Sequence, residues 1–188
     1  KIFKDENGAT YSRESLKKAF NTGNVEDKLN LRGAWLQHNR NTISRLLSLI
    51  EKTVHEVDPS MPIGFMTGDR FFEGYDFENW AHILAGPNNV PVMWRPGGGY
   101  YNDVNTSELV RKSHDIGRQV SVLPEEVVSI QSEIESFPYQ RLKKAAEIVV
   151  LEASSHIASG CTGAAFNVLS MYDEPLDEYE PLVERLME

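Results

Sequence analysis

The stretch VVSIQSEIESFPYQRLKKAAEIVVLEASSHIASGCTGAAFNVLS, residues 127–170, decides the fold class because it predicts a strand, a long helix and a second strand in succession. Residues 127–135 alternate apolar and polar side chains, which is typical of a strand. Pro138 stands in the first turn of the predicted helix, where proline is tolerated, and the helix is expected to run to Gly160. Residues 163–170 then predict another strand. A strand–helix–strand unit of this length favours parallel strands joined by a helix.

The same alternation extends over the rest of the chain. Strand-like apolar runs at 61–67 and 90–94 are each followed by a predicted helix, at 76–86 and 105–117. Further helices are predicted at 12–22, 25–57 and 175–188.

Two architectures fit this α/β pattern of parallel β/α units. One is an open doubly wound sheet, and the other is a partial (β/α)₈ TIM barrel. Four strands after a leading helix match strands five to eight of a barrel, which needs about 250 residues when whole. We therefore expect residues 1–188 to form a single region, the C-terminal half of a TIM-barrel catalytic domain and a fragment of a longer chain.

Composition narrows the function classes. The chain has 188 residues, a net charge of −9 and a pI of about 5.1, so nucleic acid is not an expected partner. No apolar run approaches the ~20 residues of a membrane helix. The single cysteine, Cys161, excludes an internal disulfide, and the five histidines lie in predicted helices without metal-ligand spacing. The glycines at 97–99 lack the spacing of a phosphate-binding loop. We expect a soluble protein with no metal and no cofactor.

Candidate site residues gather at the carboxyl ends of the predicted strands, where parallel β/α proteins bind their ligands. The set combines aromatic rings, carboxylates, amides and one arginine, a mixture that suits a sugar. Aromatic faces pack against a pyranose ring, polar groups bind its hydroxyls, and a pair of carboxylates can break a glycosidic bond. Simple packing beneath a loop is the alternative for each aromatic. The candidates are Trp94, Arg95, Tyr100, Tyr101, Gln131, Glu133, Glu135 and Asn167.

Glu133 and Glu135 present two like charges one residue apart at a strand end. An alternating strand puts them on the face of Ser129 and Gln131, while the apolar residues of the other face would meet the helices. In a barrel, the polar face turns inward near the mouth. The alternative is a solvated pair that is neutralised by Arg141 or Lys144. The expected outward apolar residues are Val128, Ile130 and Ile134.

The order of an apolar strand, Glu-x-x-Pro and a helix resembles the nucleophile segment of glycoside hydrolase family forty-two β-galactosidases and their relatives. Residues 32–66, in which a tryptophan-containing helix leads through Asp58-Pro59 into a strand, are also similar to that family's passage from helix four into strand five. The resemblance spans about residues 32–172. It implies a barrel whose seventh strand is 127–135 and a nucleophile at Glu135, with Glu133 as the rival.

The same resemblance implies retaining hydrolysis of β-glycosides, most of all β-galactosides. The family's acid/base glutamate follows an asparagine at the end of strand four. Glu6 stands in the reverse order, Glu-Asn, on no predicted strand, so we expect the acid/base outside this chain and the isolated chain to be inactive. A cation such as Arg95 is expected beside the nucleophile.

Two other function classes remain open. One is a non-catalytic carbohydrate-binding or interaction module on a half-barrel scaffold, and the other is a small-molecule enzyme on an open sheet that uses Asp69 or Asp103. A half-barrel would leave two unpaired sheet edges, so we also expect a homo-oligomer or another association through these edges.

Overall fold

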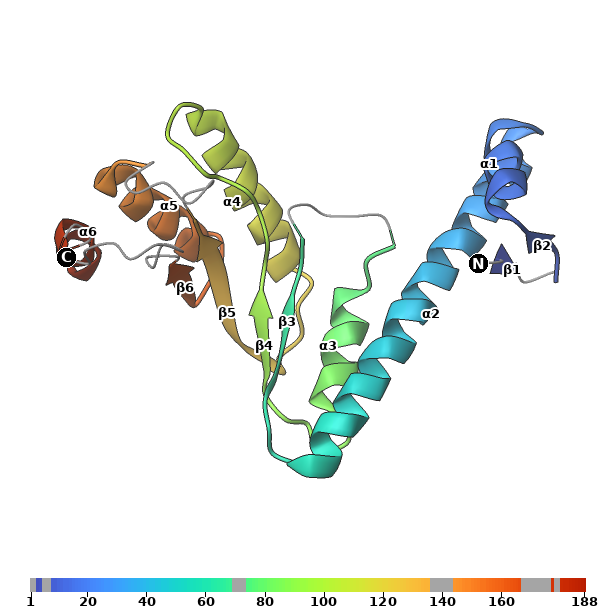
Figure 1. The fold of residues 1–188 in the computed structure, drawn as a ribbon, viewed down its shortest axis with the longest axis horizontal. Helices are drawn as coiled ribbons and strands as arrows, with labels where there is room; N and C mark the ends of the chain where they lie inside the picture. The colour runs from blue at the N-terminus through green and yellow to red at the C-terminus, as the bar shows by residue number, and fades with distance from the viewer. Residues whose placement is uncertain (1–2, 5–7, 69–73, 136–143, 167–176, 178–179) are drawn as a thin grey trace.

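A computed structural model of the chain describes residues 3–4, 8–68, 74–135, 144–166, 177 and 180–188 (Figure 1). These ranges form six helices and six strands. The elements are β1 (Phe3–Lys4), β2 (Thr10–Tyr11), α1 (Arg13–Asn21), α2 (Val25–Val57), β3 (Ile63–Met66), α3 (Phe77–Ala85), β4 (Val92–Arg95), α4 (Thr106–Val120), β5 (Val127–Ile134), α5 (Ala146–Ala158), β6 (Gly163–Phe166) and α6 (Glu180–Met187).

Four strands form one parallel sheet in the order β3-β4-β5-β6. Met66 pairs with Arg95 between the first two strands, and Glu133 pairs with Ala165 between the last two. The prediction of parallel β/α units is therefore confirmed. The spatial order follows the chain order, without the reversal that marks a doubly wound sheet.

The helices cover one face of this sheet. Val92, Trp94 and Ile130 are buried together with residues of α2, α3 and α4, and Ile134 is buried with residues of α5 and α6. These are alternate positions along their strands, so they share the face that meets the helices. The core thus lies between the sheet and a single layer of helices.

The other face of the sheet is open in the described part of the chain. Met66 is 60% exposed and Met93 is 44% exposed, and Gly64 lies on the same face. Parallel sheets in known folds usually have both faces covered, because their connecting helices or a closed barrel cover them. Two exposed methionines on the uncovered face therefore mark a surface that another layer would bury.

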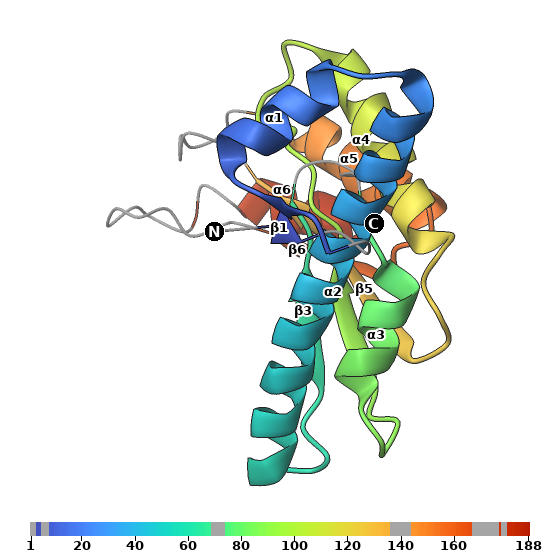
Figure 2. The same cartoon turned by 90° about the vertical axis from the view of Figure 1, so that its right-hand side faces the viewer.

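The long helix α2 carries the N-terminal elements away from the sheet (Figures 1 and 2). Its C-terminal half packs against α3, whereas α1 and the antiparallel β1–β2 pair lie at its opposite end. The predicted helix boundaries at 12–22 and 25–57 are confirmed because Ser12 and Asn24 cap α1 and α2 with their side-chain oxygens. The β1–β2 pair was not predicted.

Two local expectations were wrong. Val128 is 58% exposed rather than packed on the helices, because the pairing of β4 with β5 shifts register between Val92 and Met93. Helix α5 begins at Ala146, so Lys144 precedes it, and residues 138–143 lie outside the described part. Asp76 occupies the N-cap position of α3, although its side chain makes no capping bond.

Across the described residues, no helix combines the length and apolar character needed to span a membrane.

Candidate functional site

The carboxyl end of the sheet carries an ion pair between two neighbouring strands. Arg95, the last residue of β4, binds the carboxylate of Glu133 on β5 through a guanidinium nitrogen. Both residues alternate with buried ones, Trp94 and Ile134, so they lie on the open face. The Arg95 side chain is 40% exposed and that of Glu133 is 22% exposed. The pair is therefore accessible to a solute.

Glu135 directly follows β5 and is partly exposed. Burial lowers the pKa of Lys144, Glu152 is the main group that opposes this lowering, and the charge of Glu135 opposes it more weakly. Arg95, which was expected beside Glu135, is paired with Glu133 instead.

The four predicted aromatic and arginine residues at the end of β4 and in the loop that follows it have different surroundings. Trp94 is 1% exposed and packs against Phe65 and Phe77 in the core, on the face opposite Arg95. Tyr100 is also buried, and burial is the main cause that raises the pKa of its phenol. Neither ring offers a face to a sugar in this arrangement, because helices and loops cover both.

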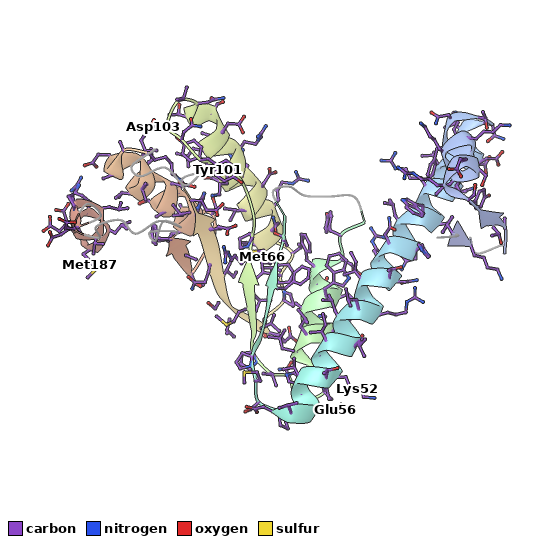
Figure 3. The ribbon with its side chains drawn as sticks, in the orientation of Figure 1. Lys52, Glu56, Met66, Tyr101, Asp103 and Met187 are labelled. Atoms are coloured by element: carbon purple, nitrogen blue, oxygen red, sulfur yellow. The ribbon has the colours of Figure 1, made fainter. Side chains whose placement is uncertain are left out.

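Tyr101 is the exception among these rings. It is partly exposed and lines a hollow of about 180 Å³ behind the glycine loop, together with Glu108, Arg111 and Asp115. Figure 3 shows Tyr101 and Asp103 beside the N-terminal end of α4. It is the predicted ring that remains accessible.

Gln131 lies on the same face of β5 as Glu133 and donates from its amide to the Ser129 hydroxyl at 3.1 Å. Gly163 on β6 faces this amide, since a Cβ there would lie 2.7 Å from the Gln131 side-chain oxygen. The structure thus brings Arg95, Gln131 and Glu133 together. Asn167, Asp69 and Glu6 lie outside the described residues.

The glycine loop after β4 is squeezed between β3 and α4. The Gly97 amide donates to the Thr67 hydroxyl at 2.9 Å, and this hydroxyl donates to Gln119 at 2.8 Å. A Cβ on Gly97 would overlap the Thr67 carbonyl oxygen, and one on Gly98 would lie 2.8 Å from the Lys112 side chain. Glycine is required here for close backbone approach. The first residues of this loop are thus held against the end of β3 and against α4.

A buried charge network beneath this loop was not predicted. The Glu152 carboxylate on α5 accepts from Lys112 at 2.8 Å and from Lys144 at 2.5 Å, and all three side chains are almost fully buried. Lys112 also donates to the main-chain oxygen of Glu133 at 2.6 Å, and Lys144 to that of Tyr100 at 2.9 Å. Charged residues on otherwise apolar helix faces were the available signal in the sequence.

His156 and Cys161 are buried next to this network. Burial, followed by the charges of Lys112 and Lys144, lowers the pKa of His156 to about 3. Burial raises the pKa of the Cys161 thiol to about 11, so the thiol is protonated. Within the described ranges, no group of histidine, cysteine and carboxylate side chains has the arrangement of a metal site.

Comparison with known proteins gives no relative: no family model, no curated protein and no solved structure matches the chain.

Proposed function

We propose that this chain is the C-terminal half of the barrel of a retaining β-glycosidase of the β-galactosidase type. The observation that carries the proposal is the placement of Glu135 immediately after β5, two residues beyond the Glu133–Arg95 pair on the open face. The carboxyl ends of parallel strands are where such folds hold their catalytic groups. The chain-order sheet with helices on one face supports the barrel.

In the proposed mechanism, Glu135 attacks the anomeric carbon and forms a glycosyl-enzyme. A second carboxylate protonates the leaving oxygen and then activates the water that releases the sugar. By the layout of the resembled family, that second carboxylate belongs to the fourth barrel strand, and we assign it to none of the described residues. Arg95 holds Glu133 on the floor of the site, next to Gln131, and Tyr101 stands near the mouth.

In the proposed barrel, strands outside this chain cover the open face of the sheet. The remaining strands of the barrel would bury Met66 and Met93 and pair with the outer edges of β3 and β6, for which the described residues provide no partner strand. An isolated chain would expose these edges and associate with further copies. Size-exclusion chromatography of the 188-residue chain alone is therefore expected to show oligomers.

The decisive experiment is to trap the intermediate with a 2-deoxy-2-fluoro-β-galactoside on the complete protein. Peptide mapping is expected to find the label on Glu135. Glu135→Gln is expected to reduce kcat on an aryl β-galactoside by several orders of magnitude. Glu126→Gln, which changes a carboxylate just before β5 and away from its carboxyl end, is the matched control and is expected to retain activity.

A label on Glu133 would show that the nucleophile lies two residues earlier and would contradict the assignment to Glu135. Unlabelled protein that still binds galactosides would favour the carbohydrate-binding module instead. The burial of Trp94 and Tyr100 argues against that module, because it removes two of the rings that would have formed its binding platform.

A further inference from the structure

The two loop segments that border the candidate site are tied to one buried carboxylate. Glu152 is 0% exposed, and each of its oxygens accepts from a different lysine. Lys112 comes from α4, and Lys144 comes from the segment just before α5. One side chain thus connects α4, α5 and the connection that leads into α5.

Each lysine also donates a hydrogen bond to a main-chain oxygen. Lys112 binds the carbonyl of Glu133 at the end of β5, and Lys144 binds the carbonyl of Tyr100 in the loop after β4. The Lys144 ammonium also lies 5.2 Å from the centre of the Tyr100 ring, within the range of a cation–π contact. These carbonyls belong to the two segments that carry the glutamates and the glycine loop.

The desolvation of three buried charges opposes folding, so this network contributes little net stability. Burying two ammonium groups and one carboxylate removes three ions from water, and apolar replacements of buried ion pairs are often neutral or stabilising. Apolar residues at these positions could not donate hydrogen bonds to the carbonyl oxygens of Glu133 and Tyr100. The charges of this network therefore fit a role in fixing backbone position.

We propose that Glu152 is a positioning residue that orients Lys112 and Lys144, and that these lysines fix the end of β5 and the loop at residues 97–104 relative to each other. A second tie acts in the same place, since the Ala145 amide donates to the Asp103 carboxylate at 3.0 Å. This fixing of the backbone does not depend on which activity the protein has. Its kinetic consequence, correct placement of the glutamates, rests on the proposed function.

Hydrogen–deuterium exchange on the complete protein tests this fixing of the backbone. Lys144→Met leaves the Lys112–Glu152 pair intact, so the protein is expected to fold, while peptides from residues 97–104 exchange at least about tenfold faster. Glu152→Gln is expected to speed exchange both there and around Glu133. Glu147→Gln, which changes an exposed glutamate on the same helix, is the control and should alter neither segment.

Unchanged exchange at residues 97–104 in Lys144→Met would overturn the proposal. Equal acceleration in every peptide would also overturn it, because the network would then serve global stability only.

A kinetic readout separates positioning from stability. Lys144→Met is expected to lower kcat by about 10- to 100-fold with little change in KM, because a small misplacement of catalytic groups has effects of this size. Faster exchange at 97–104 with an unchanged kcat would refute the kinetic role. If exchange responds as expected but the unaltered protein hydrolyses no glycoside, the proposed function fails while the tie stands.

Discussion

We expect His156 to lower the free energy of unfolding as the pH falls, and we expect His156→Gln to remove this contribution. Its imidazole is fully buried, and the pKa falls from 6.5 to about 3 because burial and the charges of Lys112 and Lys144 disfavour the protonated ring. Below pH 6.5 the unfolded chain binds a proton at this ring that the folded chain does not bind. The free energy of unfolding therefore decreases as the pH falls from 6.5 towards 3.

The size of this effect follows from the two pKa values. Each pH unit between them changes the free energy of unfolding by about 1.4 kcal/mol, so His156 accounts for a loss of about 2 kcal/mol between pH 7 and pH 5. A folded pKa nearer 4 would leave this figure almost unchanged, since pH 5 would still lie above it. In His156→Gln, the difference between the two pH values should be smaller by about 2 kcal/mol.

Urea unfolding curves at pH 7 and pH 5 measure this difference for both proteins. All other titrating groups are common to both proteins and cancel, including His55, whose pKa is raised mainly by its bond to Glu51. His114→Gln, at an exposed position on α4, is the control and should keep the pH dependence of the unaltered protein. Equal pH dependence in His156→Gln and the unaltered protein would refute the burial argument.

Four further substitutions test the packing and one partly buried ion pair. Gly97→Ala should lower the free energy of unfolding by about 1–3 kcal/mol in urea titrations, because its Cβ would overlap the Thr67 carbonyl oxygen just after β3. Gly117→Ala, with room for the methyl on α4, should raise it by about 0.5–1 kcal/mol. Glu51→Gln should destabilise more at pH 6 than at pH 9 in thermal melts, since the pKa of His55 is raised and its stabilisation disappears as the pH rises; an equal loss at both values would contradict this. Trp80→Ala should cost about 3–5 kcal/mol in chemical unfolding, because Trp80 is fully buried between α2, α3 and the sheet, and a loss below 1 kcal/mol would show that this core is not packed as described.

The sequence predicted the repeating units of the fold because local signals define them. Ser12 and Asn24 cap helices at the expected places, and the alternation in residues 127–135 marked the strand that carries the glutamates. Strand order and the uncovered face depend on contacts between distant segments, which alternation does not encode. The register shift beside Val92 is such a contact, and it leaves Val128 exposed instead of packed against the helices.

Of the candidate site, the sequence predicted only the polar residues on the open face of the sheet. The prediction placed Glu133, Arg95 and Gln131 at strand ends, and parallel pairing brings them together. The burial of Trp94 could not be read from its position, since an aromatic at a strand end suits either a pocket or a core. Glu152 was missed because a glutamate in a helix is usually exposed, and only the tertiary contact with two lysines shows otherwise.

The two glutamates at the end of β5 would repel each other if one shared environment held both. The structure divides them instead: Glu133 is paired across the open face with Arg95, and Glu135 is the carboxylate whose charge reaches Lys144. Lys144 is in turn bound by Glu152, so its position is set from inside the protein rather than by Glu135. If Glu135 is the nucleophile proposed above, the buried ammonium near it is held by Glu152 and not by the attacking carboxylate.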